Sequence, residues 1–315
     1  MSREPIAAAA VVGGAASVQL GAALGATVFP LVGPGGVVAL RQTVAAVALI
    51  AVARPRLRDL TWRSVRPTLL LGLVLVSMNL ALYGAVDRIG LGLAVTLEFL
   101  GPLALALLGS RRRIDLLTAV MAGVGVVLLT GTVPGIDLVG VLFALLAAAS
   151  WAAYIVLSRR VGQALPGVQG TALASLLAAV VTSPLLVMAL VRLAPEELAH
   201  VLLIGLGIGV LSSALPYSID LLVLRRLPQH LFSVLQSVQP AAAALAGLLV
   251  LGQELGVWQL VGLGLISLGN LIAVSRPDRS ARTDRAARTP AANGPSSSAT
   301  HRASPRPRPR PVAEG

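Results

Sequence analysis

Long apolar segments repeat along most of the chain and constrain its fold more than any other feature. Ten of them approach the roughly 20 residues that an α-helix needs to cross a bilayer core about 30 Å thick. They span residues 6–29, 36–53, 67–86, 89–109, 114–132, 138–157, 168–191, 199–224, 231–251 and 256–274. Since 56% of the residues are hydrophobic and only 12% are charged, a soluble fold would leave much apolar surface in water. We therefore predict an all-α membrane protein with ten transmembrane helices, although counts of nine or eleven stay open because some connections are very short.

The reactive residue types exclude several kinds of chemistry. The sequence contains no cysteine and no lysine, which excludes disulfides, thiolate nucleophiles, Cys-ligated metals and Schiff bases. Its three histidines, His200, His230 and His301, lack the spacing of metal ligands, and no phosphate-binding or hydrolase motif occurs. We therefore expect neither an enzyme nor a protein that holds a metal or a cofactor.

The placement of arginine predicts the orientation in the membrane. The net charge is +12, and the 25 basic residues are all arginines, which fall mainly between apolar segments or in the tail. This pattern is typical of a membrane protein rather than of one that binds nucleic acid. By the positive-inside rule, the arginine-rich connections lie in the cytoplasm; they are residues 54–66, 111–113, 159–160 and 225–226. Both termini should then be cytoplasmic. The Arg/Pro/Ser-rich tail, 276–315, is expected to be disordered, either lying against anionic lipid or binding a partner.

An internal repeat divides the apolar region into residues 1–136 and 137–275. Adding 138 to a residue number maps Pro102 onto Pro240, and several glycines follow at an offset of 139. Each half contains five predicted helices, an odd number, so the second half should enter the membrane with the opposite orientation. Two inverted five-helix repeats are typical of secondary transporters that work by alternating access. Duplication without transport is the alternative.

Glu98 is the strongest candidate for a site residue. It falls near the middle of an apolar segment, and Pro102 lacks the N–H that would bond its carbonyl four residues back. A carboxylate and a freed carbonyl together are what discontinuous helices use to hold a cation or an ammonium group. In the second half, Pro240 frees the carbonyl of Gln236, with Gln239 beside it. The alternative is a simple proline kink with a structural, hydrogen-bonded carboxyl.

Other polar and aromatic residues within the apolar segments are candidates for the lining of a substrate site. They are Gln19, Arg41, Asn79, Tyr83, Trp151, Tyr154, Tyr217 and Asp220, the last two next to the helix-breaking Pro216. The aromatic residues could equally belong to an interfacial belt. Arg41 could reach the interface by snorkelling, and Asp220 could pair with Arg225.

Several sequence blocks between residues 10 and 275 match a known family. They are Ser17-Val18-Gln19, Ala39-Leu40-Arg41, Met78-Asn79 with Tyr83, LGLAVTLEFLGPLA at 91–104, SWAAY at 150–154, SALPYS at 213–218 and RLP at 226–228. On these residues the chain resembles the threonine/homoserine exporters of the drug/metabolite transporter superfamily, whose halves are EamA-type domains. Two positions differ: Gln239 stands where the family usually has an acidic residue, and Asp220 where it often has Glu.

The resemblance implies a transporter in the bacterial inner membrane that exports small neutral amino acids, threonine and homoserine first, by proton antiport. Its partners would be the amino acid, protons and the lipid bilayer, and a homodimer is left open. In this reading Glu98 carries the coupling proton, while Arg41 attracts the substrate carboxylate with Gln19 and Tyr154 nearby. The alternatives are an EamA-type exporter of another metabolite or drug, and either a channel or a membrane scaffold that transports nothing.

Overall fold

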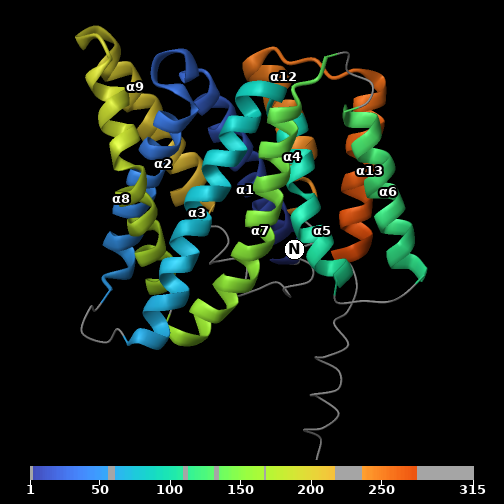
Figure 1. Ribbon diagram of the computed structural model, residues 1–315, viewed down its shortest axis with the longest axis horizontal. Helices are drawn as coiled ribbons and strands as arrows, with labels where there is room; N and C mark the ends of the chain where they lie inside the picture. Colours follow the sequence, from blue (N-terminus) through green and yellow to red (C-terminus); the bar gives the residue numbers. More distant parts are fainter. Residues whose placement is uncertain are drawn as a thin grey trace, which may run out of the picture. The chain divides into compact units, whose positions relative to one another are not determined.

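The computed structural model describes residues 3–55, 61–108, 113–130, 135–166, 168–216 and 236–274. The chain separates into two units, Met1–Arg276 and Pro277–Gly315. The second unit, and with it the predicted disordered tail, lies outside the described residues. Throughout the described part, the regular structure is helical and contains no strand (Figure 1).

The helices follow the apolar segments closely. They are α1 (Arg3–Ala26), α2 (Phe29–Ala53), α3 (Trp62–Ile89), α4 (Leu91–Glu98), α5 (Leu100–Leu108), α6 (Arg113–Thr130), α7 (Leu138–Ala164), α8 (Gln169–Val191), α9 (Pro195–Gly209), the π-helical turn η2 (Val210–Ala214), α12 (Gln239–Leu251) and α13 (Val257–Val274). Among the described residues, six helices are long and apolar enough to cross a membrane, and four shorter apolar helices accompany them. The chain is therefore a multi-pass membrane protein.

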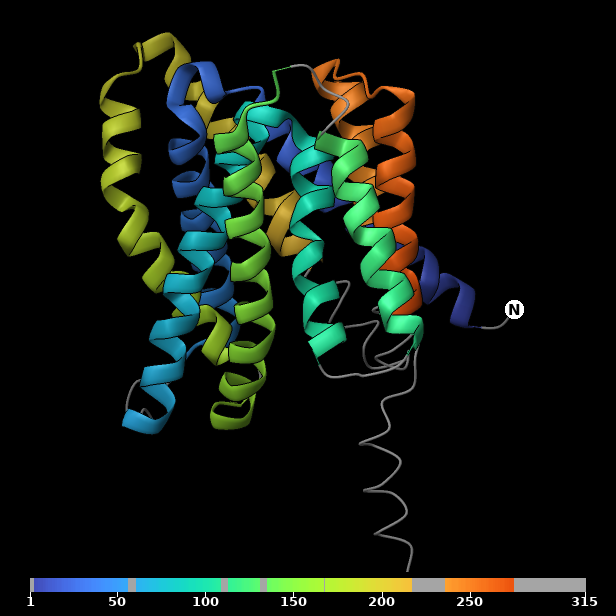
Figure 2. The same ribbon diagram turned by 45° about the vertical axis from the view of Figure 1, so that its right-hand side comes forward.

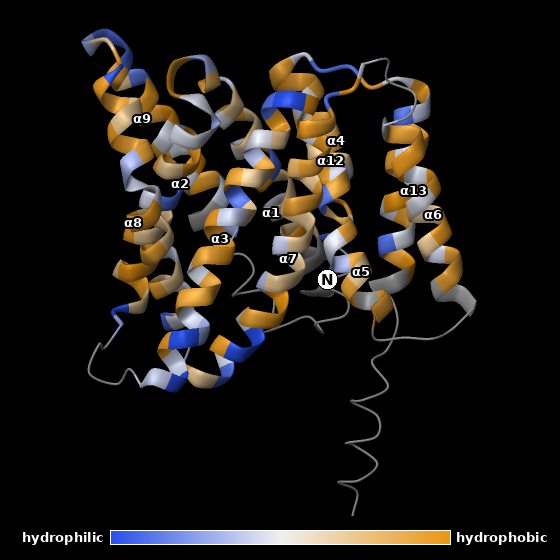
Figure 3. Ribbon diagram, in the orientation of Figure 1, coloured by the Kyte–Doolittle hydropathy of each residue, from blue (hydrophilic) through white to orange (hydrophobic). Residues whose placement is uncertain are grey.

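The outer surface of this unit is apolar over much of the helix length. Leu249, Val191 and Val127 are among many large hydrophobic side chains that are exposed. Figure 3 shows the helices mainly in the hydrophobic colour, with hydrophilic residues concentrated toward helix ends, as at the lower ends of α3 and α7. Such a surface is stable in lipid, where exposed Leu and Val side chains carry no penalty.

The start of α2 corrects one sequence prediction. A segment beginning at residue 36 was expected, but α2 begins at Phe29 and continues across a kink at Gly33, whose φ is 67°. Glycine tolerates this conformation because it has no Cβ, and it divides α2 into a short segment before Gly33 and a longer helix that follows from Pro34. The longer helix therefore begins within two residues of the predicted start at residue 36.

Helix interruptions occur near three prolines. Between α4 and α5, Phe99 forms a turn, and residues 237–238 form a turn just before α12. Pro102 and Pro240 each lie three residues after the start of their turn and cannot donate the missing backbone hydrogen bond. The π-helical turn η2 ends two residues before Pro216, as expected where the regular ladder must rearrange.

Packing places α4 at the centre of the unit. All eight residues of α4 are buried, and α3, α7 and α12 pack around it. On one side, α3 packs along α7 and α8, while α2 packs along α8 and α9. On the other side, α6 and α13 run side by side, as both Figure 1 and Figure 2 show. A polar residue at the end of α4 is thus enclosed by helices from both halves of the chain.

Candidate functional site

Glu98 ends α4 inside the helix bundle. Its side chain is only 6% exposed, and the whole of α4 around it is buried. Burial of a carboxylate is costly unless another charge or a ligand compensates it. Arg41 of α2 is the charged residue that acts electrostatically on it. The only direct ion pair within the described ranges is Arg88–Asp137, so Arg41 and Glu98 interact across a longer gap.

Arg41 lies over the ring of Tyr83 from α3. Its guanidinium carbon is 5.8 Å from the ring centroid, within the range of a cation–π interaction. Tyr83 in turn stands 5.9 Å from the ring of Phe29. Counted from the kink at Gly33, Arg41 is eight residues further along α2 (41 − 33 = 8), about two turns. Its contact with the buried ring of Tyr83 favours a role inside the bundle over snorkelling.

Tyr83 brings an unused polar group to this place. Its side chain is 1% exposed, and its hydroxyl has no hydrogen-bond partner among the residues that the structure describes. Buried hydroxyl groups are normally bonded, so an unbonded one points to a water or ligand partner. Arg41, Tyr83 and Glu98 together therefore offer a cation, a hydroxyl and a carboxyl group.

Three glutamines form a chain from α1 to the interrupted helix of the second half. Gln19 Nε2 donates to Gln239 Oε1 at 3.0 Å, and Gln239 Nε2 donates to Gln236 Oε1 at 3.2 Å. Gln19 is buried, while the other two are partly exposed. The contacts lie where α1 packs along α12. Gln239 is therefore held by neutral amides on both sides.

The remaining predicted residues divide between this region and others. Trp151 of α7 packs edge-on against Phe99, with ring centroids 4.6 Å apart, directly at the break between α4 and α5. Asn79 donates to the carbonyl of Leu75 in its own helix at 2.8 Å, which commits its amide nitrogen to the backbone. Tyr154 packs in a separate cluster with residues such as Leu71. Tyr217 and Asp220 lie outside the described residues, and Pro216, the last residue before them, is buried.

Two further amides, one buried and one partly exposed, were not found by sequence reasoning. Gln42 is buried on α2, and its Nε2 has no hydrogen-bond partner within the described part of the chain. Its position inside an apolar segment, directly after Arg41, was a usable signal. Gln253 accepts a hydrogen bond from the backbone of Leu91, which lies 162 residues earlier. No local pattern marks such a contact.

No group of three or more His, Cys, Asp or Glu side chains that could hold a metal ion occurs among the described residues. The site as described is thus built from one carboxyl, one guanidinium, amides, hydroxyls and aromatic rings.

Comparison with known proteins agrees with this architecture. Residues 138–275 match the model of the EamA-like transporter family. The chain is 40% identical over 273 residues to the threonine/homoserine exporter RhtA of Escherichia coli (strain K12), covering 84% of this chain and 90% of that protein. It is 40% identical over 269 residues to RhtA of Salmonella typhimurium (strain LT2), covering 82% and 89%.

A solved crystal structure of a protein supports the fold. It aligns with a TM-score of 0.56 at 22% identity, over 89% of this chain and 99% of that one. With the identity to RhtA over most of both sequences, the chain belongs to the RhtA family of EamA-like transporters.

Proposed function

We propose that this protein exports small neutral amino acids, threonine and homoserine first, across the bacterial inner membrane by proton antiport. The observation that carries the proposal is a buried carboxyl, Glu98, under the electrostatic influence of Arg41, whose guanidinium lies over the ring of Tyr83 with its unbonded hydroxyl. An amino acid has two opposite charges, and this arrangement offers one partner for each. The RhtA relatives, named as threonine/homoserine exporters, give the substrate class.

Arg41 would bind the substrate carboxylate through its planar fork, held in place by the Tyr83 ring. Glu98 would receive the substrate ammonium when ionised and carry a proton when empty. A buried carboxyl is disfavoured in its charged form, while an arriving ammonium favours that form, so proton and substrate compete for one group. Each proton that enters through a potential of 100 mV supplies about 2.3 kcal/mol, which can maintain a concentration ratio of roughly fifty for a neutral amino acid.

Alternating access would come from ten helices in two inverted repeats. The helix packing supports this proposal, because exchanging the halves converts several of the packings between them into packings that are also observed. The contact of α3 with α7 becomes that of α9 with α1, and the contact of α3 with α8 becomes that of α9 with α2. The turns at Phe99 and 237–238 also fall at equivalent positions. Reporter fusions after residues 134 and 160 should report opposite sides of the membrane, with the arginine-rich side and both termini in the cytoplasm.

The neutral glutamine chain favours a second candidate, an EamA-type exporter of another metabolite or drug. Gln239 is bonded to two other glutamines, and an uncharged wall there would suit a substrate other than threonine. Competition between labelled threonine and a panel of amino acids and toxic analogues separates the two candidates.

Export of labelled threonine from vesicles, with and without an imposed proton gradient, tests the proposal. Saturable uphill export that collapses when the gradient is dissipated is expected. Flux that neither saturates nor responds to the gradient would indicate a channel, and the absence of flux for every tested solute would indicate a scaffold.

A further inference from the structure

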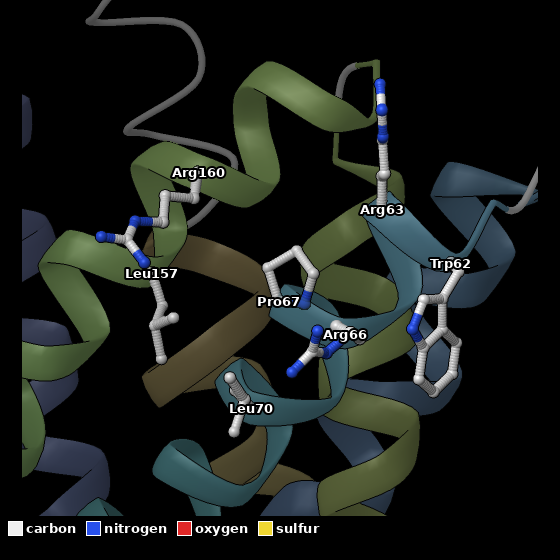
Figure 4. A pocket seen from close by; sticks show the side chains of 7 residues that line it. All are labelled: Trp62, Arg63, Arg66, Pro67, Leu70, Leu157 and Arg160. Carbon is white, nitrogen blue, oxygen red and sulfur yellow. The ribbon is translucent and has the colours of Figure 1, made fainter.

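A cavity lined by arginine lies between the beginning of α3 and the end of α7 (Figure 4). Its volume is about 460 Å³. Its lining consists of Trp62, Arg63, Arg66, Pro67 and Leu70 from α3, with Leu157 and Arg160 from α7. None of these residues takes part in the amino-acid site proposed above. The cavity is therefore a separate feature of the α3–α7 pair.

The cavity is strongly basic, and none of the described residues that line it is acidic. It presents three guanidinium groups and no carboxylate. None of the three arginines forms an ion pair within the described residues. The guanidinium of Arg66 is 6.0 Å from the centre of the Trp62 ring, which is 68% exposed, so the ring orients this arginine while its donors stay available. Guanidinium groups bind phosphate oxygens in a bidentate manner, so a phosphate is the complementary ligand.

The rest of the cavity lining is apolar. This favours the phosphate of a lipid, which carries acyl chains, over a free phosphate ion. Figure 4 shows Pro67 between Arg160 and Arg66, with Leu157 and Leu70 further along the two helices. Leu70 is 52% exposed, and Leu69 and Leu73 beside it are exposed as well. Trp62 is the residue type that membrane proteins place at headgroup depth. A free phosphate would leave this apolar surface unused, whereas acyl chains would cover it.

We propose that the cavity binds one anionic phospholipid, whose phosphate lies between Arg66 and Arg160 and whose acyl chains cover Leu70 and Leu157. The lipid would touch both α3 and α7 and so join a helix of the first half to one of the second. The chain needs no partner protein for this binding, and the proposal is independent of which solute is exported.

Native mass spectrometry of the full chain in detergent, with added phosphatidylglycerol, tests this site. The variant Arg66→Gln/Arg160→Gln should bind roughly thirtyfold more weakly than wild type, because two arginine–headgroup attractions are lost. The matched control is Arg54→Gln/Arg159→Gln, which removes the same charge from exposed arginines outside the cavity. A loss no larger than that of the control would overturn the proposal, since net charge alone would then explain binding.

Two further ligands separate the lipid from other sources of the same chemistry. Phosphatidylcholine with the same acyl chains should bind more weakly; equal binding would mean a merely apolar groove and would refute the site. Glycerol phosphate carries the phosphate without acyl chains, and it should not displace phosphatidylglycerol. Displacement by glycerol phosphate would make this a site for soluble anions and would also overturn the proposal.

The melting temperature without added lipid shows whether the glutamine variant is folded. If it is not, Arg66→Lys/Arg160→Lys replaces it, because lysine retains the charge but loses the fork. Its loss of phosphatidylglycerol binding should exceed that of Arg54→Lys/Arg159→Lys. Equal losses of phosphatidylglycerol binding in the two lysine variants would overturn the proposal that the lipid binds in this cavity.

Discussion

Gln253 accepts a hydrogen bond from the backbone N–H of Leu91 at 2.9 Å, so a residue of the loop before α13 holds the first residue of α4. Gly90, the residue before Leu91, has a φ of 83° and lies against the side-chain amide of Gln253. Gly247 of α12 lies against the same side chain. The site carboxyl ends this short helix, and the loop amide therefore positions Glu98 from the other end.

Replacing Gln253 tests this contact. Gln253→Ala leaves a buried N–H without an acceptor, and we expect a loss of about 1–3 kcal/mol in stability. The control is Gln259→Ala, since Gln259 makes the same kind of bond to Gly256 at an exposed helix start. Thermal unfolding in detergent should show the larger drop for Gln253. Equal decreases in melting temperature for the two variants would mean that the hydrogen bond to Leu91 stabilises the fold no more than the exposed one to Gly256.

Glu98→Gln mimics the protonated carboxyl. It should leave the protein folded and inserted but abolish gradient-driven export, because no proton can be released at the site. Glu196→Gln, at an exposed carboxyl, is the control and should export normally. Asp220→Asn should be milder, since that residue is predicted nearer to water. Uphill export by Glu98→Gln with unchanged pH dependence would show that another residue carries the proton.

Arg41→Lys tests carboxylate binding. Lysine keeps the charge but loses the planar fork over Tyr83, and the half-saturation concentration for export should rise roughly tenfold, equivalent to about 1.4 kcal/mol. Arg192→Lys, at an exposed position, should change nothing. An unaltered half-saturation concentration for Arg41→Lys would remove Arg41 from the binding site.

Asp137 gives a pH-dependent contribution to stability. The hydrogen bond from Arg88 at 2.7 Å, followed by that from the backbone of Gly140, lowers the pKa of Asp137 below its ordinary value of 3.8. A group with a lowered folded pKa stabilises the fold above its unfolded pKa, and the contribution disappears as the pH falls through the folded value. Asp137→Asn should thus melt at a lower temperature than wild type near neutral pH. The difference between the two melting temperatures should shrink as the pH falls below 3.8. Glu254→Gln, an exposed carboxyl, should lack this trend.

Gly101 tests the close contact of α5 with α7. A Cβ at Gly101 would overlap the carbonyl oxygen of Ala148, whereas a Cβ at Gly123 meets nothing within 4 Å. Gly101→Ala should cost about 1–3 kcal/mol and disturb the contact of Phe99 with Trp151. Gly123→Ala should be neutral or stabilising, since alanine favours helix. If both variants melt alike, α5 and α7 are less closely packed than described.

Much of the fold could be predicted from the sequence because the membrane imposes a simple rule on helix length and polarity. The apolar segments predicted the helices, and the prolines predicted where two of them lose a backbone bond. The short helical segment at residues 29–32 could not be predicted, since Gly33 and Pro34 usually end a helix and no sequence pattern marks a kink between two helical segments.

The candidate site was predicted only in part because contacts between distant segments have no local signature. The amides Gln19 and Gln239 could be named as polar residues, but their mutual bond joins positions 220 residues apart. Tyr154 was named for its polarity inside an apolar segment, and its packing against the cluster that contains Leu71 could not be predicted from that. Periodicity indicates that a residue faces other helices, and it does not indicate which one.

The antiparallel helices α3 and α7 differ in their charge interactions at the two ends of their contact. At one end, Arg88 and Asp137 attract each other at 2.7 Å, while at the other end Arg66 and Arg160 face a common space with charges of the same sign. The apolar cluster that contains Leu71 and Val161 holds the two helices together near the arginine end, where no ion pair forms within the described residues. An anion bound between Arg66 and Arg160 would therefore add to the arginine end the cross-helix attraction that Asp137 supplies at the other.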